Sequence, residues 1–209
     1  MRLLVATRSA HKMSEIREIL AGVPGLDLLS LDDAGIAPSP AEDHLEPFDS
    51  FEDNARSKAE HFQRVSGLPT VADDSGLVVD ALRGEPGVRS KRFAPDQGLD
   101  GLARDLANNR HLLRLLRNVA PEERTARYVC VAWLVDADGT ATSSRGEAPG
   151  VIVDEARGEG GFGYDAHVLD PELGVTYAEM PAAEKNVRSH RGRAFRGLGP
   201  TLAALSDPF

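Results

Sequence analysis

One segment constrains the fold more than any other part of the chain. From Ala126 to Val135 nearly every residue is apolar. Successive side chains of a β-strand point to opposite faces, and here both faces are apolar, with Tyr128, Cys130, Ala132 and Leu134 on one and Val129, Val131, Trp133 and Val135 on the other. Such a strand has to be covered on both sides. The sequence therefore predicts a central strand between two layers of other elements.

Shorter patterns predict the elements around this strand. Further strands are expected at Leu3–Ala6, Asp27–Leu31, Pro69–Ala72 and, after a hairpin turn at Asp138-Gly139, up to Glu147 and again over Val151–Val153. Helices are expected over Met13–Leu20, Phe51–Val65, Leu99–Leu116 and much of the chain after Gly163. In the Leu99–Leu116 helix we expect core packing of the leucines, and Asn108-Asn109 would allow a break. The alternation predicts a mixed α/β fold.

Composition limits the classes of partner. A chain of 209 residues that is 41% hydrophobic can form a single globular domain over residues 1–209. Its formal net charge of −9 disfavours a polymeric nucleic acid partner, although a few converging lysines could still bind a nucleotide. The single cysteine excludes an internal disulfide, and no apolar run approaches the length of a membrane span. We therefore expect a cytoplasmic protein without membrane attachment.

The acids Asp73-Asp74 are the first candidate for chemistry. They follow the Pro69–Ala72 strand and precede Ser75-Gly76, so we expect them at a strand end. Two adjacent carboxylates could bind Mg²⁺ and position or deprotonate water. Because Asp, Ser and Gly are also common in turns, a plain turn or helix start is an equally good interpretation of this segment alone.

The segment Thr7–Lys12 follows the first predicted strand and opens a helix. Free backbone N–H groups at a helix start, together with a lysine, favour a phosphate group. The glycines and the Gly-Lys-Ser/Thr ending of a Walker A loop are missing, so an ordinary helix cap explains the segment as well.

Three further groups are weaker candidates. Asn54 and Lys58 share one helical face, with Glu46 upstream, but a solvated helix would have the same pattern. The loop Gly158–Asp165 is rich in glycine and exposes two aromatic residues, which suits stacking on a base as well as simple mobility. Lys185 and the segment Ser189–Arg193 offer donors that could equally belong to a surface helix. The histidines lack metal-binding spacing such as HExxH, so zinc is not expected.

Taken in order, these motifs resemble one family. The loop over residues 7–12, the Asn54/Lys58 helix, ADDSG over 72–76, GGFGYD over 160–165 and EKxxxSHRG over 184–192 resemble the inosine triphosphate pyrophosphatases, also called XTP/dITP diphosphatases. The resemblance runs from about Leu4 to Phe195. It implies an elongated α/β fold with a long mixed β-sheet flanked by helices, two lobes around a central nucleotide cleft, and a homodimer. It also implies Mg²⁺-dependent hydrolysis of ITP, dITP and XTP to the monophosphate and pyrophosphate.

The resemblance also implies roles for individual residues. Asp74 would be the catalytic proton acceptor. The metal ligands would be Glu46, Asp73 and Asp74. The substrate-binding residues would be Thr7, Arg8, Ser9, Ala10, His11, Lys12, Asn54, Lys58, Ser75, Phe162, Gly163, Tyr164, Asp165, Lys185, His190 and Arg191.

Two segments depart from the family pattern. Where the family usually has Thr-Gly-Asn-x-x-Lys, this chain has Arg8 and Ser9 in place of the Gly-Asn pair. Where the family commonly has a Gly and a Thr after the acid, Glu46 is followed by Pro47-Phe48-Asp49-Ser50. Two alternatives stay open: a pyrophosphatase of similar design with another substrate, as in Maf-type proteins, and a nucleotide-binding sensor without turnover.

Overall fold

The structure is a computed structural model that describes residues 1–95 and 98–206. Its strands form one sheet in the order β2-β1-β3-β4-β5-β6. Their bounds are β1 (Arg2–Val5), β2 (Asp27–Leu29), β3 (Thr70–Val79), β4 (Thr125–Val135), β5 (Ala141–Ile152) and β6 (Val168–Leu169). β1 runs parallel to β2 and β3, whereas β5 and β6 are antiparallel. The sheet is therefore mixed, as predicted.

The residues group into two compact units. Unit 1 comprises Met1–Asp74, Cys130–Gly146 and His190–Phe209, and unit 2 comprises Ser75–Val129 and Glu147–Ser189. The strands β3, β4 and β5 contribute residues to both units. The expectation of a single domain over residues 1–209 stays a prediction.

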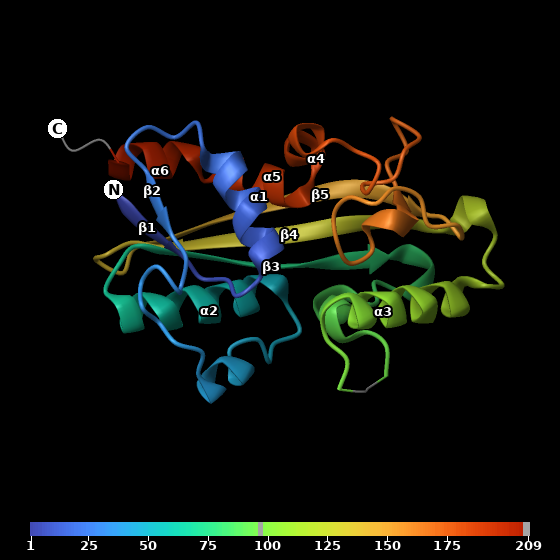
Figure 1. Ribbon diagram of the computed structural model, residues 1–209, viewed down its shortest axis with the longest axis horizontal. Coiled ribbons are helices and arrows are strands. Elements are labelled where there is room, and N and C mark those ends of the chain that lie inside the picture. The colour runs from blue at the N-terminus through green and yellow to red at the C-terminus, as the bar shows by residue number, and fades with distance from the viewer. Residues whose placement is uncertain (96–97, 207–209) are drawn as a thin grey trace. The chain divides into compact units, whose positions relative to one another are not determined.

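In unit 1, helices cover both faces of the strands. The helices are α1 (Ala10–Leu20), α2 (Phe51–Ser66), α5 (His190–Gly197) and α6 (Gly199–Ser206). Figure 1 shows α1, α5 and α6 on one side of the strands of this unit and α2 on the other. Alternate residues of β1 accordingly enter different cores: Leu3 and Val5 pack in a cluster with Ile16, and Leu4 packs in another with Phe62. The same holds for β4, which places Cys130, Ala132 and Leu134 in the first cluster and Trp133 and Val135 in the second, so the predicted coverage of this strand on both faces is confirmed.

In unit 2, a separate core joins the strands to α3 (Gly101–Leu116). This core includes Leu77, Leu112, Leu116, Tyr128 and Tyr177. The unit also contains the short helix α4 (Ala182–Arg188). The 3-10 helices of the described residues are η1 (Pro40–His44) in unit 1 and η2 (Asp80–Leu82), η3 (Gly87–Arg92), η4 (Pro121–Glu123) and η5 (Asp165–His167) in unit 2.

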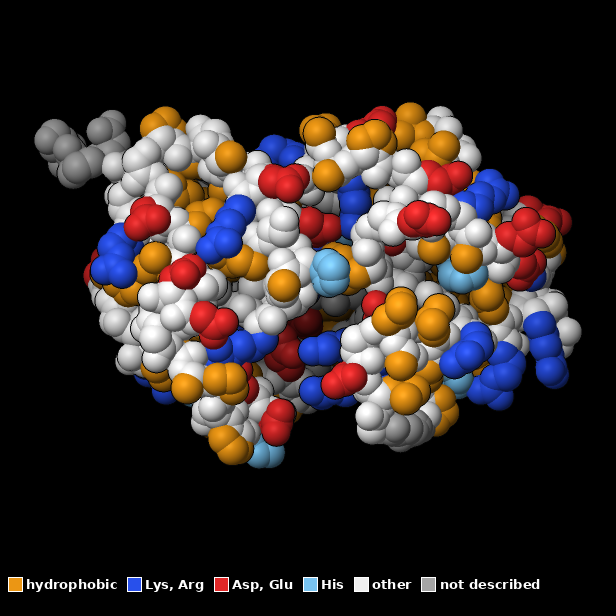
Figure 2. Space-filling model, in the orientation of Figure 1, with side chains coloured by type: hydrophobic (Ala, Val, Ile, Leu, Met, Phe, Trp, Pro, Cys, Tyr) orange, Lys and Arg blue, Asp and Glu red, His pale blue; other side chains and the backbone are white. Residues whose placement is uncertain are grey.

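One expectation about α3 was wrong, and the break that its sequence allows does not occur. The helix continues through Asn108-Asn109, because both side chains are buried and make hydrogen bonds to other segments. The leucines do not all pack in the core, since Leu102 is 74% exposed and Leu106 is 49% exposed. Only the second half of α3 places leucines in the core. Figure 2 shows the hydrophobic side chains that are exposed over this helix.

The expected strand end at Asp73 was also wrong. β3 is a single strand of 10 residues that carries both acids in its interior. Its neighbour β1 ends at Val5, which pairs with Val71, whereas β3 stays next to β4. The turn-forming residues after the acids therefore do not interrupt β3, because β4 continues to provide a paired edge. The two acids lie just beyond the carboxyl end of β1.

The return strand was predicted in two pieces and is one. β5 runs from Ala141 to Ile152 without interruption. β6 pairs with β5 only at Val151 and Ile152, so Pro149 lies where that side of β5 has no strand partner in the described chain. A proline is tolerated at such an edge because it lacks an N–H group to donate. Within residues 1–95 and 98–206, no helix is long and apolar enough to cross a membrane.

Candidate active site

The loop that follows β1 is built to start a helix. Ser9 is the N-cap of α1, and its hydroxyl accepts a hydrogen bond from the backbone N–H of Lys12 at 3.3 Å. The Thr7 hydroxyl accepts from the N–H of Ser9 at 3.2 Å. Residues 7–12 thus form a capped helix start, where the positive end of the helix dipole favours an anion.

Arg8, one of the residues that depart from the family pattern, makes ion pairs within unit 1. Its Nε and Nη2 donate to the two carboxylate oxygens of Glu42 at 3.1 and 2.8 Å, and Nη1 donates to Asp32 at 3.2 Å. Glu42 also accepts from the N–H of Ser39 in the capping box of η1. Arg8 therefore ties the helix start to η1, which precedes Glu46 in the chain.

Asp73 is a buried carboxylate with two cationic partners. Its side chain is 1% exposed, and its Oδ2 lies 3.0 Å from the Lys12 Nζ and 3.3 Å from Nη2 of Arg191. Burial alone would raise the pKa of Asp73, but Lys12, Arg191 and Lys58 hold it well below its usual range. Asp73 is consequently ionised. The other oxygen, Oδ1, is buried and has no hydrogen-bond partner among the described residues.

Asp74, the next residue, has different surroundings. It accepts a hydrogen bond from Nδ2 of Asn54 at 3.1 Å. Burial raises the pKa of Asp74 to about 6, against the opposing charges of Lys58 and Lys12 and with a contribution from Glu46. A carboxyl group with a pKa close to neutrality is suited to accept a proton. Asp74 is therefore the stronger candidate for a general base.

The helix α2 supplies the partners on this side. The Asn54 side chain also accepts from the N–H of Phe48 at 2.9 Å and donates to its carbonyl at 3.1 Å, which fixes the loop before α2. Lys58 forms an ion pair with Glu46. Burial alone would lower the pKa of Lys58, but the charges of Glu46, Asp73 and Asp74 raise it. The predicted shared face of Asn54 and Lys58 is thus confirmed, and both side chains bind acids of unit 1.

Arg191 is held on both sides by acids of unit 1. The side chain is 2% exposed, its Nη1 donates to Glu15 at 2.5 Å, and its Nε and Nη2 donate to Asp73 at 3.4 and 3.3 Å. The neighbouring His190 begins α5 and is buried as well. A substrate-binding role for these two residues stays a prediction.

The remaining predicted residues lie in unit 2. Asp165, which is 5% exposed, accepts from the N–H of Phe162 at 2.9 Å, from Lys185 Nζ at 2.8 Å and from the Tyr128 hydroxyl at 2.9 Å. The Lys185 Nζ also lies 5.2 Å from the centre of the Phe162 ring. These contacts fix the glycine-rich loop around one carboxylate. Ser75, also predicted for substrate binding, is half-buried in β3.

The expectation that both aromatic residues of this loop are exposed was wrong for Tyr164. Its side chain packs in the core of unit 2, and its hydroxyl donates to the carbonyl of Ser90 at 2.7 Å. A buried tyrosine hydroxyl requires such a partner. Phe162, which has no polar group to satisfy, is half-buried. Of these two aromatic residues, only Phe162 has exposed ring surface, and its stacking on a base stays a prediction.

Comparison with known proteins decides the family. The Ham1 family model matches residues 3–201. The chain belongs to the Ham1 family. Relatives named dITP/XTP pyrophosphatase include those of Nocardia farcinica and Geobacter sulfurreducens, each 48% identical, over 99% of this chain and 97% and 95% of the respective relative.

Solved structures agree with this assignment. A HAM1 protein from Coxiella burnetii is similar with a TM-score of 0.82 and 30% identity, over 98% of this chain and 99% of that protein. A nucleoside-triphosphatase, dITP/XTP pyrophosphatase, from Mycobacterium abscessus is similar with a TM-score of 0.70 and 38% identity, over 95% and 98%. The mixed α/β sheet flanked by helices is thus the Ham1 fold.

The donor set of this Ham1 protein suits Mg²⁺ that arrives with a phosphate ligand. In the part of the chain that the structure describes, no group of three or more His, Cys, Asp or Glu side chains could hold a metal by itself. Mg²⁺ commonly uses one or two carboxylates and completes its ligands with substrate phosphates and water. Asp74 and the unpaired Oδ1 of Asp73 are hard oxygen donors of this kind. The assignment of Glu46, Asp73 and Asp74 as metal ligands stays a prediction.

Sequence reasoning missed residues that act through others. Glu15 binds Arg191, and Tyr128 binds Asp165. A signal existed for Glu15, because it lies three residues after Lys12 and shares its helical face. Tyr128 was assigned only to a strand core, although its hydroxyl had to find a partner.

Proposed function

We propose that the protein is a Mg²⁺-dependent pyrophosphatase that cuts the unusual purine nucleoside triphosphates ITP, dITP and XTP to monophosphate and pyrophosphate, and so cleanses the nucleotide pool. The observation that carries the proposal is the contrast between two adjacent acids. Asp73 is held ionised by Lys12 and Arg191, whereas the pKa of Asp74 is raised to about 6. The names of the relatives, dITP/XTP pyrophosphatases, support the same reaction.

The residues of unit 1 have the chemistry that this reaction needs. Asp74 would accept a proton from water as the water oxygen bonds to the α-phosphorus and the bond from that phosphorus to the β-phosphate oxygen breaks. Lys12 and Lys58 would neutralise the phosphates and the departing pyrophosphate. Mg²⁺, held by Asp74 with Glu46 or Asp73, would supply further neutralisation of the phosphate oxygens. A bound triphosphate would compete with Asp73 for the Lys12 ammonium group.

The base would be selected by hydrogen-bond donors. Hypoxanthine and xanthine have a carbonyl oxygen at C6, whereas adenine has an amino group there. N–H donors of the protein can therefore bind the C6 oxygen of the first two bases but not the C6 amino group of adenine. Candidate donors are His190, Lys185 and backbone groups of the loop Phe162–Asp165. Because the Arg191 guanidinium already binds Glu15 and Asp73, it is a weaker candidate for this contact. GTP also has a C6 oxygen, so its rejection depends on contacts at the 2-amino group.

The test is pyrophosphate release from ITP, dITP, XTP, ATP, GTP and dTTP at equal concentration, with Mg²⁺ and with EDTA. We expect fast release from the first three only, and loss of release in EDTA. Release from other nucleotides instead would move the protein to a sister specificity such as that of Maf-type proteins. Binding without release from any nucleotide would favour a sensor.

We further propose a cytoplasmic homodimer. The resemblance to the inosine triphosphate pyrophosphatases supports this assembly. Light scattering coupled to size exclusion should give twice the chain mass of 22.4 kDa. A mass of one chain at micromolar concentration would contradict it.

A further inference from the structure

Two side chains of the helix α3 form hydrogen bonds to one residue of the glycine-rich loop, Gly163. The N–H of Gly163 donates to Oδ2 of Asp105 at 2.9 Å, and the carbonyl of Gly163 accepts from Nδ2 of Asn109 at 2.9 Å. Asp105 and Asn109 are four residues apart and share one face of the helix. Both backbone groups of Gly163 are therefore held by side chains of α3.

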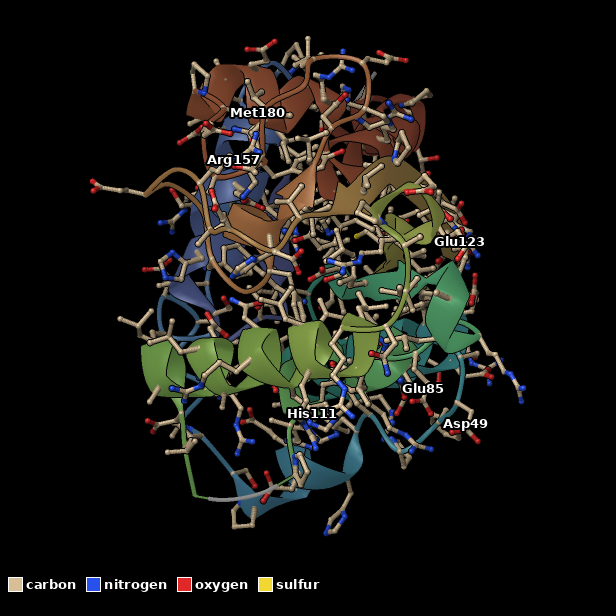
Figure 3. The ribbon with its side chains drawn as sticks, turned by 90° about the vertical axis from the view of Figure 1, so that its right-hand side faces the viewer. Asp49, Glu85, His111, Glu123, Arg157 and Met180 are labelled. Atoms are coloured by element: carbon tan, nitrogen blue, oxygen red, sulfur yellow. The ribbon has the colours of Figure 1, made fainter. Side chains whose placement is uncertain are left out.

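The next residues of the loop are held from a second point. Asp165 accepts from the N–H of Phe162, while Lys185 and Tyr128 bind the same carboxylate. Phe162 is thus held at its own N–H by Asp165, and the next residue, Gly163, is held by α3. The position of its ring depends on both anchors. Figure 3 looks onto α3, which carries the labelled His111, and shows the loops with Arg157 and Met180 above it.

The loop is open where a ligand would approach it. Gly163 has a φ of +66°, and no described atom lies within 4 Å of the place where a Cβ would stand. At Gly161, by contrast, an added Cβ would lie 2.2 Å from Oδ2 of the Asp165 carboxylate. Glycine at an open, left-handed position allows close approach of a ligand to the backbone.

Packing alone does not explain a buried asparagine at position 109. It is 7% exposed, and its Oδ1 is buried with no hydrogen-bond partner anywhere in the residues that the structure covers. Leaving a buried acceptor unsatisfied costs free energy that an apolar side chain would avoid. The Nδ2 contact with Gly163 is what an apolar residue could not provide.

We propose that Asp105 and Asn109 are positioning residues that hold Phe162 in place and thereby set the discrimination between purine bases. The inference rests on the proposed function, in which the loop Phe162–Asp165 flanks the base. Neither residue is among those proposed to act on the reacting phosphate. Their loss should loosen base recognition while leaving the chemistry of Asp74 intact.

The experiment measures kcat and KM for ITP, XTP, GTP and ATP in Asn109→Ala, Asp105→Ala and Asp105→Asn. We expect the ratio of kcat/KM for ITP over GTP to fall by about tenfold in the two alanine variants, mainly through KM for ITP. Asp105→Asn should retain the wild-type ratio within about threefold, because its amide oxygen still accepts from the Gly163 N–H.

Asn108→Ala is the matched control. Asn108 is a buried asparagine of the same helix, but its side chain binds the backbone of Ser90, Lys91 and Ala94 instead of Gly163. It should lower the melting temperature while keeping the ratio of ITP over GTP.

The outcomes separate the two proposals. If the wild-type protein does not prefer ITP and XTP, the proposed function fails. If the wild type discriminates and the alanine variants at 105 and 109 discriminate equally well, the positioning role is overturned. It is also overturned if Asn108→Ala lowers the ratio of kcat/KM for ITP over GTP to the same extent. The same holds if Asp105→Asn lowers that ratio as much as Asp105→Ala does.

Discussion

Replacing Arg191 should destabilise the protein far more than replacing an arginine in an equally short surface ion pair. Arg191 lies 2.5 Å from Glu15 and is 2% exposed. Arg145 lies 2.6 Å from Glu52, and both of those side chains are 43% exposed. The two pairs have nearly the same length but differ in burial, and Arg191 binds the buried Asp73 as well.

The expected magnitudes follow from that burial. Arg191→Leu leaves Asp73 buried with Lys12 as its one remaining ion-pair partner in the described chain, and it leaves Glu15 without its arginine. Removing one partner of a buried pair costs about 3–5 kcal/mol. The exposed pair of Arg145 is screened by water and contributes roughly 0.2–1 kcal/mol. At about 2–4 °C per kcal/mol for a chain of this size, Arg191→Leu should lower Tm by about 6–20 °C.

The assay is urea unfolding at pH 7, followed by circular dichroism, together with a thermal scan. Arg145→Ala is the control and should stay within about 1 kcal/mol of the wild type. If Arg191→Leu does not yield folded protein, Glu15→Gln removes only one of the charges and should give an intermediate loss of stability. A change for Arg191→Leu no larger than that for Arg145→Ala would refute the reasoning.

Three other predictions concern single positions. Asp74→Asn should fold and bind nucleotide but lose hydrolysis by about 10²-fold or more, and unchanged turnover would exclude its role as base. Gly146→Ala should lower Tm strongly, because a Cβ there would lie 2.2 Å from a backbone oxygen of α5, whereas Gly22→Ala, with no atom of the described chain within 4 Å, is the control. Burial would raise the pKa of Asp170, but the Arg188 side chain and two backbone N–H groups lower it. The stability that it contributes is therefore present above about pH 4 and is lost as pH falls through the lowered pKa. The free energy of unfolding of Asp170→Asn, measured with urea, should be lower than that of the wild type at pH 7 and should converge with it in acid.

Local patterns predicted the elements whose signal lies in neighbouring residues. The two apolar faces of Ala126–Val135 and the shared face of Asn54 and Lys58 depend only on the periods of a strand and a helix. The interior of β3 depends on more than that. Ser75-Gly76 has the composition of a turn, but the adjacent strand β4 keeps the backbone extended. Tertiary pairing thus overrode a local turn signal.

Ion pairs between segments far apart in the chain could not be predicted from the sequence. Arg191 and Glu15 are separated by 176 positions, and Arg191 and Asp73 by 118. From the sequence, Arg191 was either a donor for a substrate or part of a surface helix, and its burial against two acids was not expected. A single chain without its fold does not determine which cation meets which carboxylate, because charge alone allows many pairings.

The contrast between Asp73 and Asp74 follows from the period of the strand. Neighbouring carboxylates suggest a shared cation, but adjacent residues of β3 face opposite sides of the sheet. Val71 packs in the same cluster as Ile16 of α1, and Ala72 packs in the cluster of Phe62 of α2.

Asp73, two residues after Val71, accordingly meets Lys12 of α1 and Arg191 of α5. Asp74, two residues after Ala72, meets Asn54 of α2. Two identical side chains next to each other therefore acquire pKa values on opposite sides of the ordinary value for aspartate. Where environments separate two carboxyl groups in this way, the one with the raised pKa is the one able to exchange a proton near neutral pH. The alternation of one strand thus gives the two acids different nearest partners, which supports the proposal that Asp74, and not Asp73, accepts the proton.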